Sequence, residues 1–190
     1  MTSMTPDEVL SFWLDDVGPE GWYKQDDTLD DTIRSRFSKA WDAAMEGRYA
    51  LWMTYPSGTL AYLILTDQFP RNMFRGSSKA FASDRIALAV AKKAIGQGYD
   101  LKIDAPARQF FYMPLMHSEN LCDQERCVRL MHERMPDQDN LLHARAHREI
   151  IREFGRFPYR NAALERKASH EENTFVTDGG YAKTLERLRA

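Results

Sequence analysis

Helix caps, prolines and glycines divide this sequence into short segments whose apolar residues recur at helical spacing. Thr5-Pro6-Asp7-Glu8 and Ser169-His170-Glu171-Glu172 have the pattern of a capping box, a serine or threonine followed three residues later by glutamate. A long helix is expected over about 27–46, because its apolar residues repeat every fourth position: Leu29, Ile33, Phe37 and Trp41. No segment shows the sustained alternation of a β-strand. The sequence therefore predicts an all-α fold, with about eight to ten helices arranged as antiparallel hairpins in a single domain over residues 1–190.

Serine, proline and glycine residues predict where other helices begin and end. Ser57 is expected to cap a helix that ends at Phe69-Pro70, because proline disfavours helical geometry in the residue before it. Ser118 is expected to cap a helix that ends at about Arg134. A later helix is expected from Asp137 to Phe154, with Gly155 as its C-terminal stop.

Composition and local patterns limit the partners of the chain. It has 26 basic and 28 acidic side chains and a net charge of −2, which gives no overall attraction to nucleic acid or to an acidic membrane. The longest apolar run, Leu60–Leu65, is far shorter than the roughly 20 residues that span a bilayer. Met1–Leu10 contains no basic residue and does not have the pattern of a signal peptide. We therefore expect a cytoplasmic protein that binds neither nucleic acid nor membrane; its oligomeric state stays open.

The sequence also lacks the common cofactor and metal motifs. It contains no glycine-rich phosphate loop, no nucleophile elbow and no dinucleotide fingerprint. Its two cysteines, Cys122 and Cys127, do not have a metal-binding spacing. His143 and His147 lie four residues apart and face the same side of a helix, but the HExxH pattern and further ligands are missing. We therefore expect no cofactor and no metal, and place His147 at the edge of the core.

Arginine outnumbers lysine in this sequence, 18 to 8. Arginine binds carboxylate or phosphate through two hydrogen bonds, although a codon bias would produce the same excess. Asp67-Gln68-Phe69-Pro70-Arg71-Asn72, the first Phe-Pro motif, is echoed by Gly155-Arg156-Phe157-Pro158-Tyr159-Arg160-Asn161, the second Phe-Pro motif. If the two motifs face one another, four guanidinium groups converge on one anionic ligand. These groups belong to Arg71, Arg75, Arg156 and Arg160.

A structural interpretation of the same arginines is open as well. Each arginine then pairs with a helix C-terminus or with a nearby carboxylate, the candidates being Asp67, Asp84 and Glu119. A second candidate cluster is His117-Ser118-Glu119, in which a histidine next to an acid is suited to acid–base chemistry. Consecutive side chains diverge, however, so Ser118 is better interpreted as the helix cap.

These patterns lead to three hypotheses about function. The first is a polar, arginine-rich pocket that binds a small anionic ligand or the acidic end of a peptide. The second is an enzyme, a hydrolase or transferase, that uses His117 or His147 as its acid–base group, with no catalytic residue assigned. The third is a helical scaffold for a protein partner. The residues expected to bind the ligand are Asp67, Gln68, Arg71, Asn72, Arg75, His117, Glu119, His147, Arg156, Arg160 and Asn161.

Five segments together carry a resemblance to a known family. They are Val9–Trp13, Leu65–Asn72, Phe74–Gly76, Phe111–Glu119 and Gly155–Asn161. Over about residues 7–177 the chain resembles the bacterial domain-of-unknown-function 924 family. The resemblance implies a helical, tetratricopeptide-repeat-like fold and no established reaction. Tyr159 departs from the family pattern, which usually has histidine between the proline and the arginine.

Overall fold

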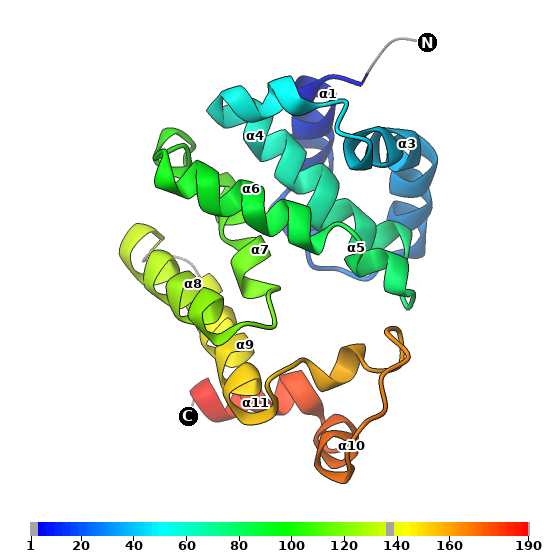
Figure 1. The fold of residues 1–190 in the computed structure, drawn as a ribbon, viewed down its shortest axis with the longest axis vertical. Coiled ribbons are helices and arrows are strands. Elements are labelled where there is room, and N and C mark those ends of the chain that lie inside the picture. The colour runs from blue at the N-terminus through cyan, green and yellow to red at the C-terminus, as the bar shows by residue number, and fades with distance from the viewer. Residues whose placement is uncertain (1–3, 136–138, 190) are drawn as a thin grey trace. The chain divides into compact units, whose positions relative to one another are not determined.

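The computed structural model describes residues 4–135 and 139–189, and none of them lies in a β-strand (Figure 1). The prediction of an all-α fold is confirmed. The chain divides into two compact units, Met1–Pro114 and Leu115–Ala190, which are described separately below. Whether the whole chain is one domain stays a prediction. Among the described helices, none combines the length and the apolar character that a bilayer span requires.

The first unit consists of α-helices joined by short 3₁₀ and π-helical turns. Its α-helices are α1 Pro6–Leu10, α2 Gly18–Gly21, α3 Asp27–Met45, α4 Pro56–Leu63, α5 Phe69–Met73 and α6 Asp84–Gly96, and α7 Met113–Met116 crosses the unit boundary. Its 3₁₀ helices are η2 Ala50–Thr54, η4 Ser78–Phe81, η5 Asp100–Lys102 and η6 Ala107–Phe111. Two π-helical turns, η1 Ser11–Val17 and η3 Ile64–Gln68, join α1 to α2 and α4 to α5. The chain is therefore continuously helical from Pro56 to Met73.

Local signals explain how several helices begin. The capping box of Thr5 is confirmed, because its side chain accepts a hydrogen bond from Glu8 N at 3.3 Å and Glu8 Oε2 accepts one from Thr5 N at 2.7 Å. The prediction that Ser57 caps α4 is wrong, since Tyr55 is the extended residue before the helix and Pro56 occupies its first turn. Proline suits that position because the first helical amides have no partner within the helix.

Aromatic residues from three helical segments form the centre of the first unit. The ring of Phe69, on α5, lies 4.6 Å from that of Phe37 on α3 and 5.4 Å from that of Trp13 on η1. All three side chains are fully buried. Such ring pairs contribute about 0.5–1.5 kcal/mol beyond the burial of their apolar surface. Helix α5, which contains four of the six residues of the first Phe-Pro motif, is therefore held against α3 (Figure 1).

The helix through the first Phe-Pro motif does not end at Phe69-Pro70, so that prediction is wrong. Phe69 keeps helical angles, φ −58° and ψ −38°. Pro70 has no amide to donate to the carbonyl of Thr66, four residues earlier. That carbonyl instead accepts a hydrogen bond of 2.5 Å from Ser83 Oγ, and Ser83 in turn accepts one of 3.1 Å from Trp41 Nε1. The π-helical turn and the buried Ser83 hydroxyl together accommodate the proline.

The second unit is built on a long helix with neighbours on two sides. Its elements are α8 Leu121–Arg134, α9 Asn140–Phe154, η7 Pro158–Arg160, α10 His170–Thr177 and α11 Gly180–Arg189. Helix α9 packs against α8 and against α11 (Figure 1). The core of this unit contains Ile150, Ile151 and Phe157. The expected start of α9 at Asp137 lies outside the described residues.

Of the two helix caps predicted in the second unit, one is confirmed and one is wrong. Ser169 forms the predicted capping box with Glu172 at the start of α10. Ser118 does not cap α8, because Asn120 does so by accepting hydrogen bonds from the amides of Cys122 and Asp123. Asn and Ser are equally good caps, so the sequence pattern did not separate the two positions.

Candidate functional site

The first Phe-Pro motif places a buried carboxylate in the π-helical turn η3. The side chain of Asp67, 1% exposed, accepts hydrogen bonds from Gln68 Nε2 at 2.6 Å and from Arg71 Nη2 at 3.3 Å. The same Arg71 nitrogen lies 3.0 Å from Asp84 Oδ1 at the start of α6. Burial acts to lower the pKa of Arg71, but the two carboxylates outweigh it and raise that pKa. Arg71 therefore stays charged and ties η3 to α6.

A second cluster of the first unit surrounds Asp30 on α3. Its oxygens accept hydrogen bonds from Arg75 Nε at 2.8 Å, from Arg75 Nη2 at 2.9 Å and from Asn72 Nδ2 at 2.8 Å. Burial acts to raise the pKa of Asp30, and the hydrogen bonds from Arg75 and Asn72 outweigh it and lower that pKa. Asp30 is not among the residues predicted from the sequence, although an acid on the same helical face as Ile33 and Phe37 indicates that a buried partner exists.

The second Phe-Pro motif follows a true helix end. Gly155 ends α9 with φ +70°, in the left-handed region that favours glycine. Phe157 is then extended, with φ −92° and ψ 106°, and Pro158 begins η7. The amide of Phe157 donates a hydrogen bond of 2.8 Å to Glu119 Oε1. The extended turn therefore brings the motif to the segment that precedes α8.

Glu119 is held by a bidentate pair with Arg166. The Nη1 and Nη2 atoms of Arg166 lie 2.6 Å and 3.0 Å from the two carboxylate oxygens of Glu119, and Arg166 Nε donates to Asn161 Oδ1 at 3.0 Å. Burial acts to raise the pKa of Glu119, and the bonds from Arg166 and from the Phe157 amide outweigh it and lower that pKa. Arg166 was missed because nothing near it in the sequence points to Glu119, 47 positions earlier.

Arg156 pairs within its own neighbourhood. Its Nε and Nη2 atoms lie 2.5 Å and 2.7 Å from the two carboxylate oxygens of Glu172, and Nη2 also donates to Lys167 O at 2.9 Å. The hydrogen bond from Arg156, followed by that from the Ser169 amide, lowers the pKa of Glu172 to about 2. The pair therefore fixes the second Phe-Pro motif to the start of α10.

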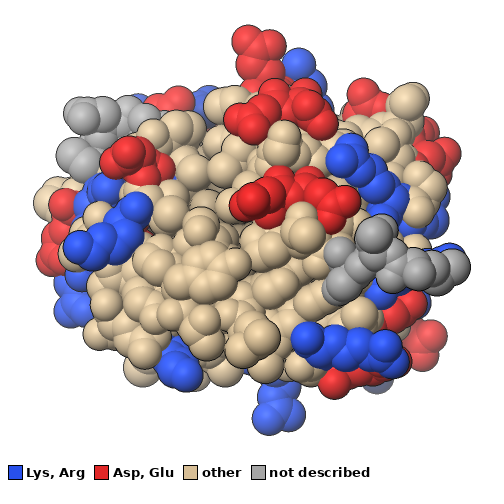
Figure 2. All heavy atoms as spheres, turned by 90° about the horizontal axis from the view of Figure 1, so that it is seen from above, with Lys and Arg blue, Asp and Glu red and all other residues tan. Residues whose placement is uncertain are grey.

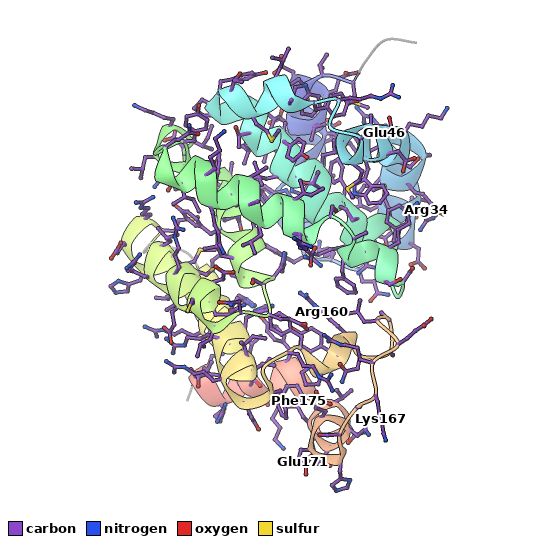
Figure 3. The ribbon with its side chains drawn as sticks, viewed as in Figure 1. Arg34, Glu46, Arg160, Lys167, Glu171 and Phe175 are labelled. Atoms are coloured by element: carbon purple, nitrogen blue, oxygen red, sulfur yellow. The ribbon has the colours of Figure 1, made fainter. Side chains whose placement is uncertain are left out.

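Arg160 links the second Phe-Pro motif to the histidines. Its Nη1 atom donates a hydrogen bond of 3.0 Å to His117 O, and its guanidinium carbon lies 4.4 Å from the centre of the Phe157 ring. Only 8% of Arg160 is exposed, and Figure 3 shows it on the short helix η7. The imidazole of His147 lies 5.4 Å from the Phe157 ring and 6.5 Å from that of His117. Arg160 is therefore a buried cation beside two histidines.

One hydrogen bond and its burial define the tautomer and the protonation state of the His147 imidazole. Its Nδ1 atom lies 2.9 Å from His143 O, so Nδ1 carries the proton and Nε2 is the acceptor. Burial, with smaller effects of His117 and Arg160, lowers the pKa of His147 to about 3, so the ring is neutral at pH 7. Tyr181, which lies 4.9 Å from His147 between ring centres, has its hydroxyl 2.6 Å from His143 Nδ1. Tyr181 is not among the residues predicted from the sequence.

The predicted site residues thus form separate groups within the two units. Those of the first unit lie in the carboxylate-bound clusters: Asp67, Gln68, Arg71, Asn72 and Arg75. Those of the second unit lie around the second Phe-Pro motif: His117, Glu119, His147, Arg156, Arg160 and Asn161. The convergence of all four arginines on one ligand stays a prediction.

Charged side chains elsewhere do not gather into one large patch of a single sign on the face shown in Figure 2. There, acidic and basic side chains form separate small groups around an uncharged central area. Within residues 4–135 and 139–189, no group of three His, Cys, Asp or Glu side chains has the arrangement needed to hold a metal ion.

The comparisons with known proteins agree with the resemblance seen in the sequence. A family model described as a bacterial protein of unknown function, DUF924, matches residues 9–180. A solved structure, that of the protein of unknown function ATU0120 from Agrobacterium tumefaciens, is similar to this chain at a TM-score of 0.87 and 35% sequence identity. The similarity covers 92% of this chain and 97% of that one. No curated protein matches. Since the family model spans most of the chain, the protein belongs to the bacterial DUF924 family.

Proposed function

We propose that the chain binds a small anionic ligand, one that carries a carboxylate or a phosphate, in its second unit. The binding site is the histidine–arginine cluster, defined as His117, Glu119, His147, Arg160 and Arg166. The observation that carries the proposal is that Arg160 joins two segments that are 43 residues apart in the sequence. Its guanidinium contacts both the His117 carbonyl and the Phe157 ring. Buried arginine at a convergence of polar groups is the usual means of recognising such anions.

The charge of the histidine–arginine cluster supports an anion. Arg166 is paired with Glu119, which balances its charge, and Arg160 adds a further positive charge, while His147 is neutral. An anion bound beside His147 favours the protonated imidazole, because opposite charges within a few ångströms raise a histidine pKa. Binding is therefore expected to strengthen as the pH falls and to be accompanied by proton uptake.

A second candidate function, a helical scaffold for a protein partner, has its own supporting observation. Arg71, Arg75 and Arg156 each contact a carboxylate, from Asp67 and Asp84, from Asp30 and from Glu172 respectively. Arginines with these contacts serve to fix helices and turns. For them the structural interpretation accounts for the contacts without a ligand.

Acid–base catalysis by His147 has weaker support. A general base works best when its pKa lies near the operating pH. With a pKa of about 3, His147 binds a proton poorly at pH 7 and has none to donate from Nε2. The hypothesis of an enzyme that uses His117 stays a prediction.

Isothermal titration with inorganic phosphate and with succinate tests the proposal. We expect millimolar or tighter binding that weakens at least about tenfold in Arg160→Gln, the loss of one charge-assisted pair. Arg71→Gln, an arginine of the first unit removed in the same way, is the matched control and is expected to bind as the parent does. Circular dichroism establishes that both variants are folded. Equal binding by the parent and Arg160→Gln, or no binding by the parent, would contradict the proposal.

A further inference from the structure

A groove in the second unit lies apart from the histidine–arginine cluster. It has a volume of about 730 Å³ and is formed by the C-terminal end of α9 together with α10 and α11. Figure 3 shows two of its residues, Glu171 and Phe175, on α10. None of the residues expected to bind a ligand from the sequence lines this groove. It is therefore a surface that the proposed anion site does not explain.

The floor of the groove is apolar. The rings of Phe154 and Phe175 lie 4.9 Å apart at an angle of 50°, and both pack on the core of the second unit. Thr174 and Thr184 line the groove, and their hydroxyls donate to carbonyls of their own helices at 3.0 Å and 3.2 Å. Because both hydroxyl donors are already bonded within their own helices, a bound ligand does not need to offer them a hydrogen-bond acceptor. The floor therefore favours an apolar side chain.

The rim of the groove is charged and predominantly acidic. Carboxylates stand on all three of its walls: Glu153 on α9, Glu171 and Asp178 at the two ends of α10, and Glu186 on α11. Its two lysine and arginine residues are Lys183 and Arg187, and Lys183 lies 3.9 Å from Asp178. The rim thus has an excess of two negative charges. An acidic rim favours a basic partner and repels an acidic one.

We infer that this groove holds a basic amphipathic helix of a partner protein. The inference rests on the second candidate function, the helical scaffold for a protein partner. It adds which surface binds the partner and which chemical character the partner has. An amphipathic helix places apolar side chains at positions i, i+3 or i+4, and i+7 on one face, which suits a floor of two phenylalanines. Lysines and arginines beside that stripe then face Glu153, Glu171 and Glu186. The anion site and the groove have charges of opposite sign and so select different partners.

The test uses a synthetic peptide of about 14 residues, four helical turns, with leucines on one face and lysines beside them. A scrambled peptide of the same composition removes the apolar stripe, and a peptide with glutamate in place of lysine reverses the charge. Binding to the full chain is measured by fluorescence anisotropy at two salt concentrations. We expect the basic amphipathic peptide to bind best and its binding to weaken as salt rises.

Charge-reversal variants locate the binding. Glu153→Lys with Glu186→Lys changes two exposed rim residues and is expected to weaken binding at least about tenfold. Glu20→Lys with Asp42→Lys makes the same change of net charge at exposed residues of the first unit and is expected to leave binding unchanged. Thr174→Trp, which fills the groove from an exposed position, is expected to weaken binding as well.

Other results would overturn the inference. Equal binding of the scrambled peptide, or equal weakening by both charge-reversed pairs, would mean that only net charge is recognised. Displacement of the peptide by an equal concentration of spermidine would mean that the groove takes small cations. Binding of the acidic peptide in place of the basic one would overturn the partner chemistry but leave the scaffold function standing, whereas binding of neither would overturn both.

Discussion

The two Phe-Pro motifs share most of their residues, yet the chain passes through them in different ways. Phe69 is helical and Phe157 is extended. Gly155, with φ +70°, ends α9 before the second proline, whereas the helix before the first proline has no such stop and continues as a π-helical turn. The effect of a proline on a helix therefore depends on what precedes it and on whether the carbonyl it leaves without an amide finds another donor.

The two motifs also use their arginines differently. In the first motif, Arg71 bonds to two carboxylates and joins η3 to α6. In the second, Arg156 also bonds to a carboxylate, that of Glu172, but Arg160 bonds to a backbone carbonyl and lies on an aromatic ring beside two histidines. We therefore propose a structural role for Arg71 in the first motif and ligand binding by Arg160 in the second.

The largest effect is expected from Asp67→Ala, which tests the structural role of the first motif. The substitution removes the buried carboxylate of this pair and leaves the partly buried guanidinium of Arg71 with Asp84 alone. Removing one member of a buried pair costs about 3 kcal/mol of unfolding free energy. Urea denaturation measures the change, with the exposed Asp31→Ala as control. A loss comparable to that of the control would mean that the pair contributes little.

A smaller loss is expected from Ser83→Ala, which tests how the helix passes Pro70. The variant leaves the Thr66 carbonyl and the Trp41 indole N–H without the hydroxyl that joins them, at a cost of about 2 kcal/mol. Ser35→Ala removes an exposed hydroxyl that also bonds to a carbonyl and is expected to have little effect. If thermal denaturation shows equal stability for both variants, the proline does not need the Ser83 hydroxyl.

The smallest effects are expected at two glycines, with opposite signs. Gly155→Ala places a side chain at φ +70° and should destabilise the chain by about 1 kcal/mol through backbone strain alone, since a Cβ there meets nothing within 4 Å. Gly96→Ala, at the end of α6, also meets nothing but has no positive φ, so it should stabilise the chain by about 0.5 kcal/mol. Melting temperatures that move in the same direction would remove the contrast between the two helix ends.

Sequence reasoning succeeded where the physical cause is local. The all-α class and the capping boxes of Thr5 and Ser169 depend on residues within one helical turn. The continuation of the helix through Pro70 was not predictable, because its cause is a hydroxyl 17 residues beyond the carbonyl of Thr66.

The same distinction applies to the candidate site. The proximity of Glu119 to the second Phe-Pro motif could be suspected from residue type, since Glu119 was already a candidate partner for arginine. Its actual partner Arg166 is 47 residues away. Asp30, which binds Arg75 from 45 residues away, was missed for the same reason.

The imidazole nitrogen signals of His147 test the central claim, that the second motif and not the first binds the ligand. Because the folded pKa of about 3 lies below the unfolded value of about 6.5, His147 is neutral in the free protein at pH 6. The same difference means that its contribution to stability is complete above the unfolded value and is lost as the pH falls toward 3. When phosphate is added at pH 6, the account predicts that the His147 signals move toward those of the protonated ring. Unchanged His147 signals, together with shifts at the amides around Arg71, would contradict it.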